Sequence, residues 1–470
     1  MSESIAEMII PGTYIEVRAE GLISVTSPAT GNIGVVGTAS RGPVGTVVPL
    51  GSYADAIDTF GVYDPFATPT VTDTPLTLTR AIEQLYMGGA GSVYAVRIAN
   101  GDPTFASADV HASGAAEGFT LTAIDAGSWG NTIEYTLVNQ GTDADPNWTL
   151  TLVAGSTKEV YSGANVGAVH DAVAGGSSAL VTIGTASNLS SAFDTVAAAT
   201  AFTGGSDLPN VSSTDVESGL AALEPDIINI LVVAGMGSST IRAVVGAHLE
   251  QTENDGRERI AILGTTSSDA SDVAAEVALI ADKRIVLVAP GIQATDAPTG
   301  TNVTLPPAYL AAVVAGKLST LAPEISLTNA TVPVNDLDVY YNSATLKSLL
   351  LDRVLLVRPK FGFQIVKGIT TDTGAFKQIS VRRVVDYAKA GVRSGADPYI
   401  GRLNNVRVRA ALKATLDGFL SQMVLDEMLV SYQLDVTATR AQEIAGIAVV
   451  SMTLAPTFSI DYIRVTMTLQ

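Results

Sequence analysis

In the stretch IINILVVAGMGSSTIRAVVGAHLEQT, residues 227–252, a run of apolar residues is followed by a segment whose apolar positions recur at helical spacing. The same order returns in RIAILGT (259–265), DASDVAAEVALIADK (269–283) and RIVLVAP (284–290). Continuous apolar strands separated by amphipathic helices are typical of a parallel sheet that is covered by helices on both faces. The stretch therefore predicts an α/β core with a parallel or mixed sheet.

Upstream of this core the amino-acid composition of the sequence changes. A helix is expected over residues 77–88, where it ends at Gly88. From about residue 100 to residue 205 the chain is rich in Ala, Gly, Ser, Thr and Asp. Strand-like pieces in this section lie at 118–124, 131–139 and 148–155. We expect the section to be a separate β-rich domain that is inserted on the outside of the molecule.

The last quarter of the sequence predicts one long helix, residues 405–428, with Asn404 as its N-cap. Apolar residues recur on one face of this helix: Leu412, Leu416, Phe419, Leu420, Met423 and Val424. The opposite face is basic near its start, at Arg407, Arg409 and Lys413. Because the helix macrodipole opposes positive charge at an N-terminus, these bases indicate either a compensating partner or an ordinary solvated face.

Each end of the sequence predicts an amphipathic strand with no sequential partner, at residues 13–19 and 460–469. An unpaired strand exposes a row of backbone donors and acceptors, which is what strand addition between chains uses. The residues expected in these two arms are Tyr14, Ile15, Glu16, Val17 and Arg18 at one end and Tyr462, Ile463, Arg464, Val465 and Met467 at the other.

Together these patterns predict a multidomain fold of the mixed α/β (α+β) class. The expected segments are an N-terminal arm (1–25), the first part of the core (26–100), an inserted β-rich outer domain (101–205), the α/β core (206–350), an α+β C-terminal domain (351–455) and a C-terminal arm (456–470). A chain of 470 residues is long enough for two to four such units, because a single core stops growing at roughly 250 to 300 residues.

Composition narrows the range of functions. The net charge is −19, so the chain is a poor general binder of nucleic acid or of anionic membranes. The charge is uneven, since residues 351–470 hold 15 Lys and Arg against 10 Asp and Glu. This asymmetry indicates either an acidic partner for the last quarter or a plain solvated surface. The chain has no cysteine, which excludes disulfides and thiolate chemistry, and it has neither a secretory signal nor an apolar run of membrane-spanning length.

Catalytic patterns are weak. The three histidines, His111, His170 and His248, lie far apart in the sequence and lack a nearby second ligand. The best enzyme candidate is VVAGMGSSTIR, residues 232–242, where Gly235 and Gly237 follow a strand and open a helix as in a dinucleotide-binding turn. The third glycine of that fingerprint is Thr240, and the next strand lacks the acidic residue that would bind a ribose. We therefore expect no enzyme, no cofactor and no metal site, and keep a nucleotide-binding α/β enzyme as the alternative.

Several segments resemble the sheath proteins of contractile tails, which are found in myovirus-type phages and related contractile injection systems. The resemblance rests on PGTYIEV (11–17), GNIGVVGTASRGPVGTVVPLGSYADAIDTFG (31–61), AGSWGNTIEYTL (126–137), LPPAYLAAVVAGKL (305–318), NNVRVRAALKATLDGFLSQMV (404–424) and FSIDYIRVTMTL (458–469). One departure is LAPEISLTNATV (321–332), where many relatives carry a Trp-Lys-Pro-Ala-Asn element.

The resemblance implies a structural subunit that forms six-membered rings, stacked helically around an inner tail tube protein. It implies that the arms exchange strands between subunits and that contraction drives the tube through a target envelope. The residues expected to face the tube are Arg402, Arg407, Arg409 and Lys413. Baseplate and tail terminator proteins are further expected partners, without nucleic acid or direct membrane insertion. The expected location is a virion tail, or a contractile injection particle, assembled in the bacterial host cytoplasm. A static tube or shell protein built through the same arms remains a second alternative.

Overall fold

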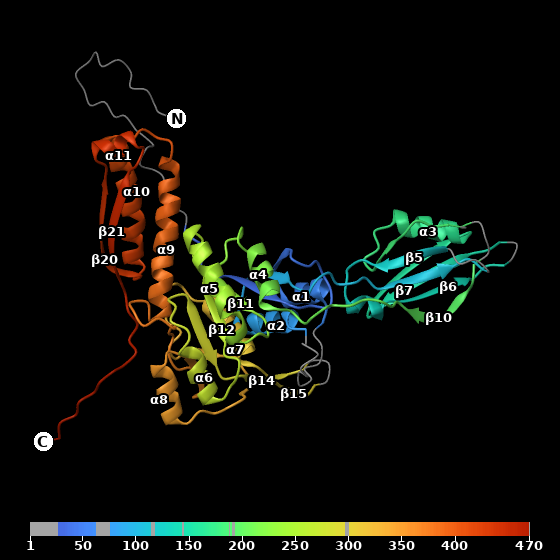
Figure 1. Ribbon diagram of the computed structural model, residues 1–470, viewed down its shortest axis with the longest axis horizontal. Helices are drawn as coiled ribbons and strands as arrows, with labels where there is room; N and C mark the ends of the chain where they lie inside the picture. Colours follow the sequence, from blue (N-terminus) through green and yellow to red (C-terminus); the bar gives the residue numbers. More distant parts are fainter. Residues whose placement is uncertain are drawn as a thin grey trace, which may run out of the picture.

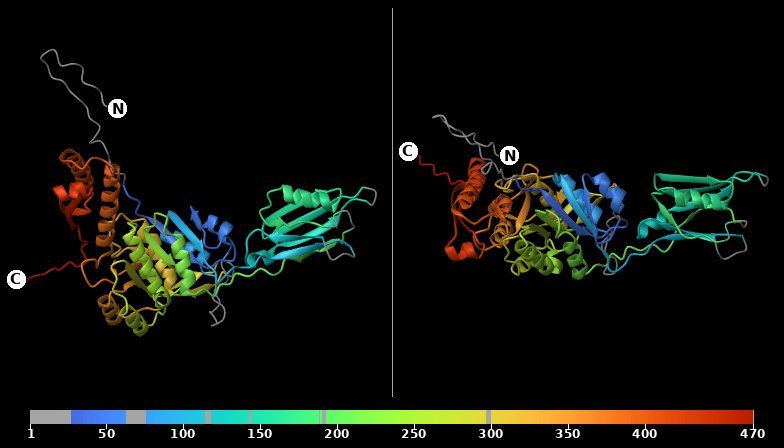
Figure 2. Two further views of the ribbon diagram at one scale, coloured as in Figure 1. Left: turned by 45° about the horizontal axis from the view of Figure 1, so that its top comes forward. Right: turned by 90° about the horizontal axis from the view of Figure 1, so that it is seen from above.

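The computed structural model describes residues 27–62, 76–113, 118–142, 145–187, 189, 193–296 and 300–469. Over this part of the chain the molecule is elongated, with an α/β core in the middle, a β-rich section at one end and a helical C-terminal section at the other (Figure 1). The further views in Figure 2 show the same order of the three sections. The mixed α/β class predicted from the sequence is confirmed. The strand predicted at residues 13–19 lies outside the described residues.

The core is built on a nine-stranded mixed sheet with the order β16-β19-β18-β13-β12-β11-β1-β3-β2. Strands β18, β13, β12, β11, β1 and β3 run parallel. At one edge β2 pairs antiparallel with β3, and at the other β19 pairs antiparallel with β18 and β16 pairs antiparallel with β19. Their bounds are β1 Asn32–Gly37, β2 Val47–Leu50, β3 Ser92–Arg97, β11 Ile230–Val233, β12 Ile260–Gly264, β13 Ile285–Ala289, β16 Thr331–Val332, β18 Leu355–Pro359 and β19 Phe363–Ile365. The central strands β11, β12 and β13 are buried at every residue, as their apolar runs predict.

Helices cover both faces of this sheet. Val232 of β11 belongs to the core cluster on one face, while its neighbours Leu231 and Val233 belong to the cluster on the other. The first face is covered by α1 Tyr53–Phe60, α2 Leu78–Gly88 and α7 Pro307–Ser319. The second is covered by α4 Ser213–Ala222, α5 Ser238–Asn254, α6 Ala270–Val277 and α8 Ser343–Leu351. A small sheet of β14 Ile292–Thr295, β15 Asn302–Leu305 and β17 Asp336–Leu337 extends the core.

The β-rich section has its own hydrophobic core between two sheets. One sheet contains β4 Ser107–His111, β5 Gly118–Ala123 and β9 Val181–Ile183, and the other contains β6 Glu134–Asn139, β7 Trp148–Ala154, β8 Thr157–Gly163 and β10 Val196–Ala201. It also contains the 3₁₀ helix η2 Ser128–Thr132 and the helix α3 Val166–Gly175, which the sequence interpretation did not include. The buried Arg97 ties it to the core, since its Nη1 donates to the carbonyl oxygens of Gly42 and Ala126, each at 2.7 Å.

The C-terminal section pairs two long helices with a two-stranded sheet. Its elements are α9 Ile379–Ala396, η3 Asp397–Tyr399, α10 Val406–Leu425, β20 Leu429–Thr437, α11 Arg440–Ile444 and β21 Val449–Pro456. The rings of Tyr387 and Phe419 stack between α9 and α10 with their centroids 5.8 Å apart. The predicted N-cap Asn404 is wrong by one position, because the side chain of Asn405 accepts the hydrogen bond from the Val408 amide at 2.9 Å.

The expected strand at 460–469 is not formed in the single chain, because a lone strand has no partner to complete its hydrogen bonds. Within the described residues, no helix is both long and apolar enough to span a membrane.

Candidate assembly site

The sheet of β20 and β21 presents two open edges. The strands pair with each other antiparallel, from Leu429 opposite Pro456 to Thr437 opposite Val449. One face packs on α10 through side chains such as Tyr432, Leu434 and Leu454. Among the residues that the structure describes, no strand pairs with the outer edge of either β20 or β21. Each edge therefore offers backbone donors and acceptors to a strand from elsewhere.

Beyond β21 the chain continues as an exposed apolar segment. Its large apolar residues are almost fully solvent-exposed, with Ile463 at 83%, Met467 at 87% and Leu469 at 98%. In this segment Tyr462, Arg464 and Val465 are exposed as well. Exposed apolar side chains that follow one another in this way are typical of a surface that binds a partner.

The start of this segment is anchored to the body of the molecule. The carboxylate of Asp461 lies 3.2 Å from Lys367 Nζ and accepts a hydrogen bond from Gln378 Nε2 at 3.2 Å. Burial lowers the pKa of Lys367, but the hydrogen bond and charge of Asp461 outweigh burial, so the pKa is raised. The segment therefore leaves from a fixed point beside the first turn of α9.

Two of the four basic residues predicted to face a tube, Arg409 and Lys413, form ion pairs within the chain. Arg409 Nη1 lies 3.0 Å from Glu443 Oε1, with only 11% of its side chain exposed. Lys413 Nζ lies 3.3 Å from Asp435 Oδ1. Arg402 packs against the ring of Tyr399, and Arg407 is exposed on the first turn of α10. These ion pairs join α10 to α11 and to β20, so part of the basic face stabilises the section itself.

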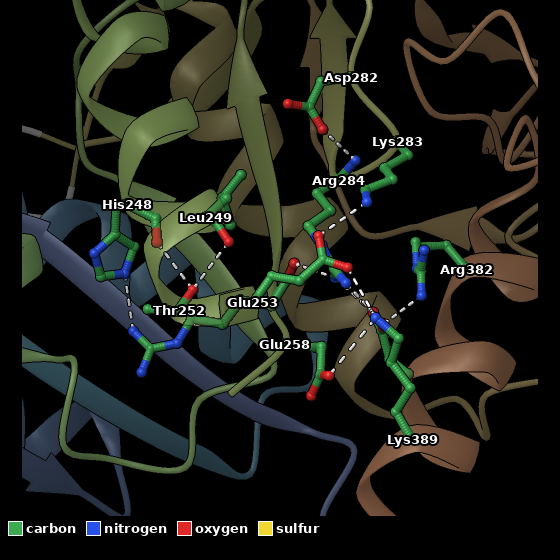
Figure 3. Close-up of polar contacts among 12 residues, drawn as sticks. His248, Leu249, Thr252, Glu253, Glu258, Asp282, Lys283, Arg284, Arg382 and Lys389 are labelled. Carbon is green, nitrogen blue, oxygen red and sulfur yellow. Dashed lines mark hydrogen bonds and ion pairs between the residues drawn. The ribbon is translucent and has the colours of Figure 1, made fainter. Parts of the chain in front are cut away.

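A buried ion-pair cluster fixes α9 to the α/β core (Figure 3). Glu253, near the end of α5, accepts from Arg284 Nε at 2.9 Å and from the Nζ atoms of Lys283 and Lys389 at 2.9 and 2.8 Å. Arg284 also reaches both carboxylate oxygens of Asp386 on α9, at 2.8 and 3.0 Å. The Arg284 side chain is 2% exposed, so its pairing is needed to offset its loss of hydration.

The pKa shifts follow from this pairing. The hydrogen bond from Arg284 is the main cause that holds the pKa of Glu253 far below its usual range, against the effect of burial, with smaller contributions from Lys389 and Lys283. Burial opposes the charged form of Arg284, yet the carboxylates of Glu253 and Asp386 outweigh burial and raise its pKa. The roles of these residues were not predicted from the sequence, although Lys283 and Arg284 stand directly before an apolar strand.

The glycine turn that resembled a dinucleotide site is filled by protein. A Cβ on Gly235 would lie 2.4 Å from Thr77 Cγ2, and one on Gly237 would lie 2.4 Å from Thr266 Oγ1. At the first turn of α5, Ser238 donates a short hydrogen bond to the buried carboxylate of Glu276, which also accepts from the Thr266 amide at 2.9 Å. The Glu276 carboxylate thus lies beside the first turn of α5, and the small residues Gly235 and Gly237 serve close packing.

The histidines have separate structural surroundings. His248 Nε2 lies 2.9 Å from Arg259 Nη1, and burial, followed by the charge of Arg259, lowers the pKa of His248 to about 4. His170 contacts Asp171 and the Gly184 carbonyl, and His111 lies exposed on β4. In the described ranges, no group of three or more His, Cys, Asp or Glu side chains is arranged to hold a metal ion.

Residues 371–470 match the family model of the phage tail sheath C-terminal domain. Among curated protein sequences, nothing matches the chain. The fold is similar to that of the sheath tail protein of Desulfitobacterium hafniense, with a TM-score of 0.69 and 16% identity, over 95% of this chain and 100% of that chain. For the sheath tail protein of Listeria innocua the TM-score is 0.67 at 14% identity, over 94% of this chain and 95% of that chain.

The helical sheath of the anti-feeding prophage in its contracted state is also similar, with a TM-score of 0.57 and 15% identity, over 98% of this chain and 99% of that chain. The resemblance drawn from the sequence is thus confirmed. The chain has the fold of these tail sheath proteins, and its residues 371–470 match the phage tail sheath C-terminal domain.

Proposed function

We propose that this chain is the structural subunit of a contractile tail sheath, in a phage tail or a related injection particle. Six subunits form each ring, and the rings stack helically around an inner tube protein between a baseplate and a terminator. The observation that carries the proposal is the C-terminal family match, because it coincides with the open sheet edges and the exposed apolar segment.

In this assembly the segment after β21 leaves one subunit and adds a strand to the sheet of a neighbour. The alternation of Ile463, Val465 and Met467 with Tyr462 and Arg464 supports this role, since a strand added to a sheet buries every second side chain. Residues 13–19, with Tyr14, Ile15, Glu16, Val17 and Arg18, act as the second arm, from the segment outside the described residues. The arms persist while the bodies of the subunits repack.

Contraction then needs no catalytic group. The extended sheath is metastable, and a tighter lattice buries more surface between subunits, at about 25 cal/mol per Å² of apolar area before entropic costs. The exposed bases Arg402 and Arg407, with Arg409 and Lys413 beside them, face the tube and contribute a salt-dependent contact. The ion pairs around Arg284 transmit the motion, because they hold α9 and the C-terminal section against the core.

Removal of the C-terminal segment tests this proposal. A chain that ends at Pro456 should stay folded and monomeric, because β21 ends there and the segment contributes little to its own core. The full chain should form large particles in sedimentation velocity at the same concentration. The chain with Ile463, Val465 and Met467 each replaced by Ser serves as the length-matched control and should also stay monomeric. Large particles of the truncated chain would refute the role of this segment.

A further inference from the structure

A basic cavity of 780 Å³ lies between α8 and the loop that leads from β19 to α9. The apolar part of its lining, called the floor below, comprises Leu346, Leu350, Val366 and Ile369. The lining also contains five cationic side chains, called the rim below: Lys347, Arg353, Arg358, Lys367 and Lys377. Asp352 is the only carboxylate among the described residues that line the cavity. The combination of an apolar floor and a cationic rim is suited to a peptide that carries apolar side chains and carboxylates.

Three of these cations have no internal partner. Across the described ranges, Lys347, Arg358 and Lys377 form no ion pair or side-chain hydrogen bond. The Nε atom of Arg358 is buried and has no hydrogen-bond partner, which is costly unless another group satisfies it. By contrast, Arg353 donates to the Thr371 carbonyl at 2.9 Å and Lys367 pairs with Asp461. The cavity therefore combines an apolar surface with cationic side chains that no carboxylate of the described residues neutralises.

The complementary pattern occurs in this chain, outside the described residues. Residues 2–10 read SESIAEMII, in which Glu3 and Glu7 alternate with Ile5, Met8, Ile9 and Ile10. Residues 1–26 as a whole carry four acidic side chains and one basic side chain. Carboxylates spaced four residues apart and apolar side chains between them match the rim and the floor of the cavity.

The position of the cavity favours a neighbouring copy as the source. Tyr462 lines the cavity, so the C-terminal segment leaves the molecule along its border. The described chain begins elsewhere, where Asn229 Nδ2 donates to the Ala29 carbonyl and Arg383 donates to the Thr30 carbonyl. Between residue 10 and residue 27 the chain can span up to about 55 Å when extended, so residues 2–10 are not confined to the surface beside residue 27.

We propose that residues 2–10 of a second copy of this chain bind in the basic cavity, with Glu3 and Glu7 pairing with Lys347, Arg358 and Lys377 and the isoleucines on the apolar floor. This inference rests on the proposed assembly of neighbouring copies. It assigns to the first residues a docking site separate from the edges of β20 and β21. The bound segment ties the core of one subunit to the N-terminal arm of the next.

Cross-linking in the full chain tests the proposal, because the natural sequence has no cysteine. Ser4→Cys is placed in one variant and Leu351→Cys in another, since Leu351 lines the cavity and is 74% exposed. The two variants are mixed at assembly concentration and treated with a short bismaleimide. We expect a dimer that contains one copy of each variant. Lys158→Cys, at an exposed position of β8, replaces Leu351→Cys in the control mixture and should give little dimer.

Charge provides the second readout. Adding Lys347→Glu and Lys377→Glu to the Leu351→Cys variant should lower the yield of the mixed dimer about fivefold at low salt, since exposed ion pairs each contribute modestly. A yield equal to that of the Lys158→Cys control would overturn the inference. A third variant with both Ser4→Cys and Leu351→Cys, diluted with unmodified chain, would overturn it too if its cross-links formed only within single chains. Electron microscopy of the same mixtures separates the two proposals, because tubes without mixed dimers would retain the sheath function and remove the docking site.

Discussion

At the scale of single residues, a buried arginine links the α/β core to the C-terminal section. Arg284 stands at the start of β13 and joins Glu253 of α5 to Asp386 of α9. The sequence revealed the apolar strand that follows Arg284 but not these partners, because Glu253 and Asp386 are 31 and 102 positions away. Likewise, Gly235 and Gly237 were identified as special from the sequence, yet only packing against Thr77 and Thr266 explains why a side chain is excluded there.

Replacing Arg284 should destabilise the fold strongly. Arg284→Met leaves the partly buried carboxylates of Glu253 and Asp386 without their shared cation, and loss of one partner of a buried ion pair costs about 3 kcal/mol or more. Lys389→Met is the matched control, because Lys389 binds the same Glu253 but is 36% exposed, and it should cost less than about 1 kcal/mol. Urea midpoints of the two variants measure the difference, and equal midpoints would contradict the account.

The stability of the core should fall on mild acidification because of His248. Its pKa in the folded chain is about 4, below the value of 6.5 that it has when exposed, so the unfolded chain binds a proton first as the pH falls. The stabilisation is therefore complete above pH 6.5 and is lost progressively toward pH 4, by about 3 kcal/mol. His248→Gln should flatten the dependence of the urea midpoint between pH 7 and pH 5. His111→Gln, at an exposed position, should retain the dependence, and a loss in this control would contradict the assignment.

At the scale of helices and strands, periodic segments were predictable and partner-dependent ones were not. The alternation of apolar strands and amphipathic helices over residues 227–290 predicted β11 to β13 with α5 and α6, because burial on both faces leaves a continuous apolar run. Helix α10 was predicted within three residues of its ends from one apolar face. Helix α3 was missed, since its Ala- and Gly-rich sequence lacks a clear polar face. The segment 460–469 has strand periodicity without a partner in the single chain.

The contact of α2 with α7 depends on glycine. A Cβ on Gly316 of α7 would lie 2.1 Å from the Leu85 carbonyl oxygen of α2, and backbone cannot move aside as a side-chain end can. Gly316→Ala should therefore destabilise the core by about 1 to 3 kcal/mol. Gly246→Ala on α5 is the matched control, because that position has open space and alanine favours a helix by about 0.5 to 1 kcal/mol. Thermal unfolding should show opposite shifts, and a stabilised Gly316→Ala variant would contradict the close approach.

At the scale of the whole molecule, the C-terminal section is less enclosed than the rest of the described chain. Its core and its insert each have a hydrophobic centre, whereas its C-terminal sheet has two strands with open edges and is followed by an exposed apolar segment. The sequence predicted the mixed fold and, through its terminal patterns, the resemblance to tail sheath proteins. It did not predict that Arg409 and Lys413 are paired within the chain, because Glu443 and Asp435 approach them only through tertiary packing.

Electron microscopy of the purified full chain, alone and at high concentration, tests whether the chain assembles by itself. We expect hollow cylinders built from stacked six-fold rings, since the open edges and the exposed segment then find partners in neighbouring copies. Dispersed single chains at every concentration, with the fold intact by circular dichroism, would contradict the claim that these surfaces suffice to assemble a sheath.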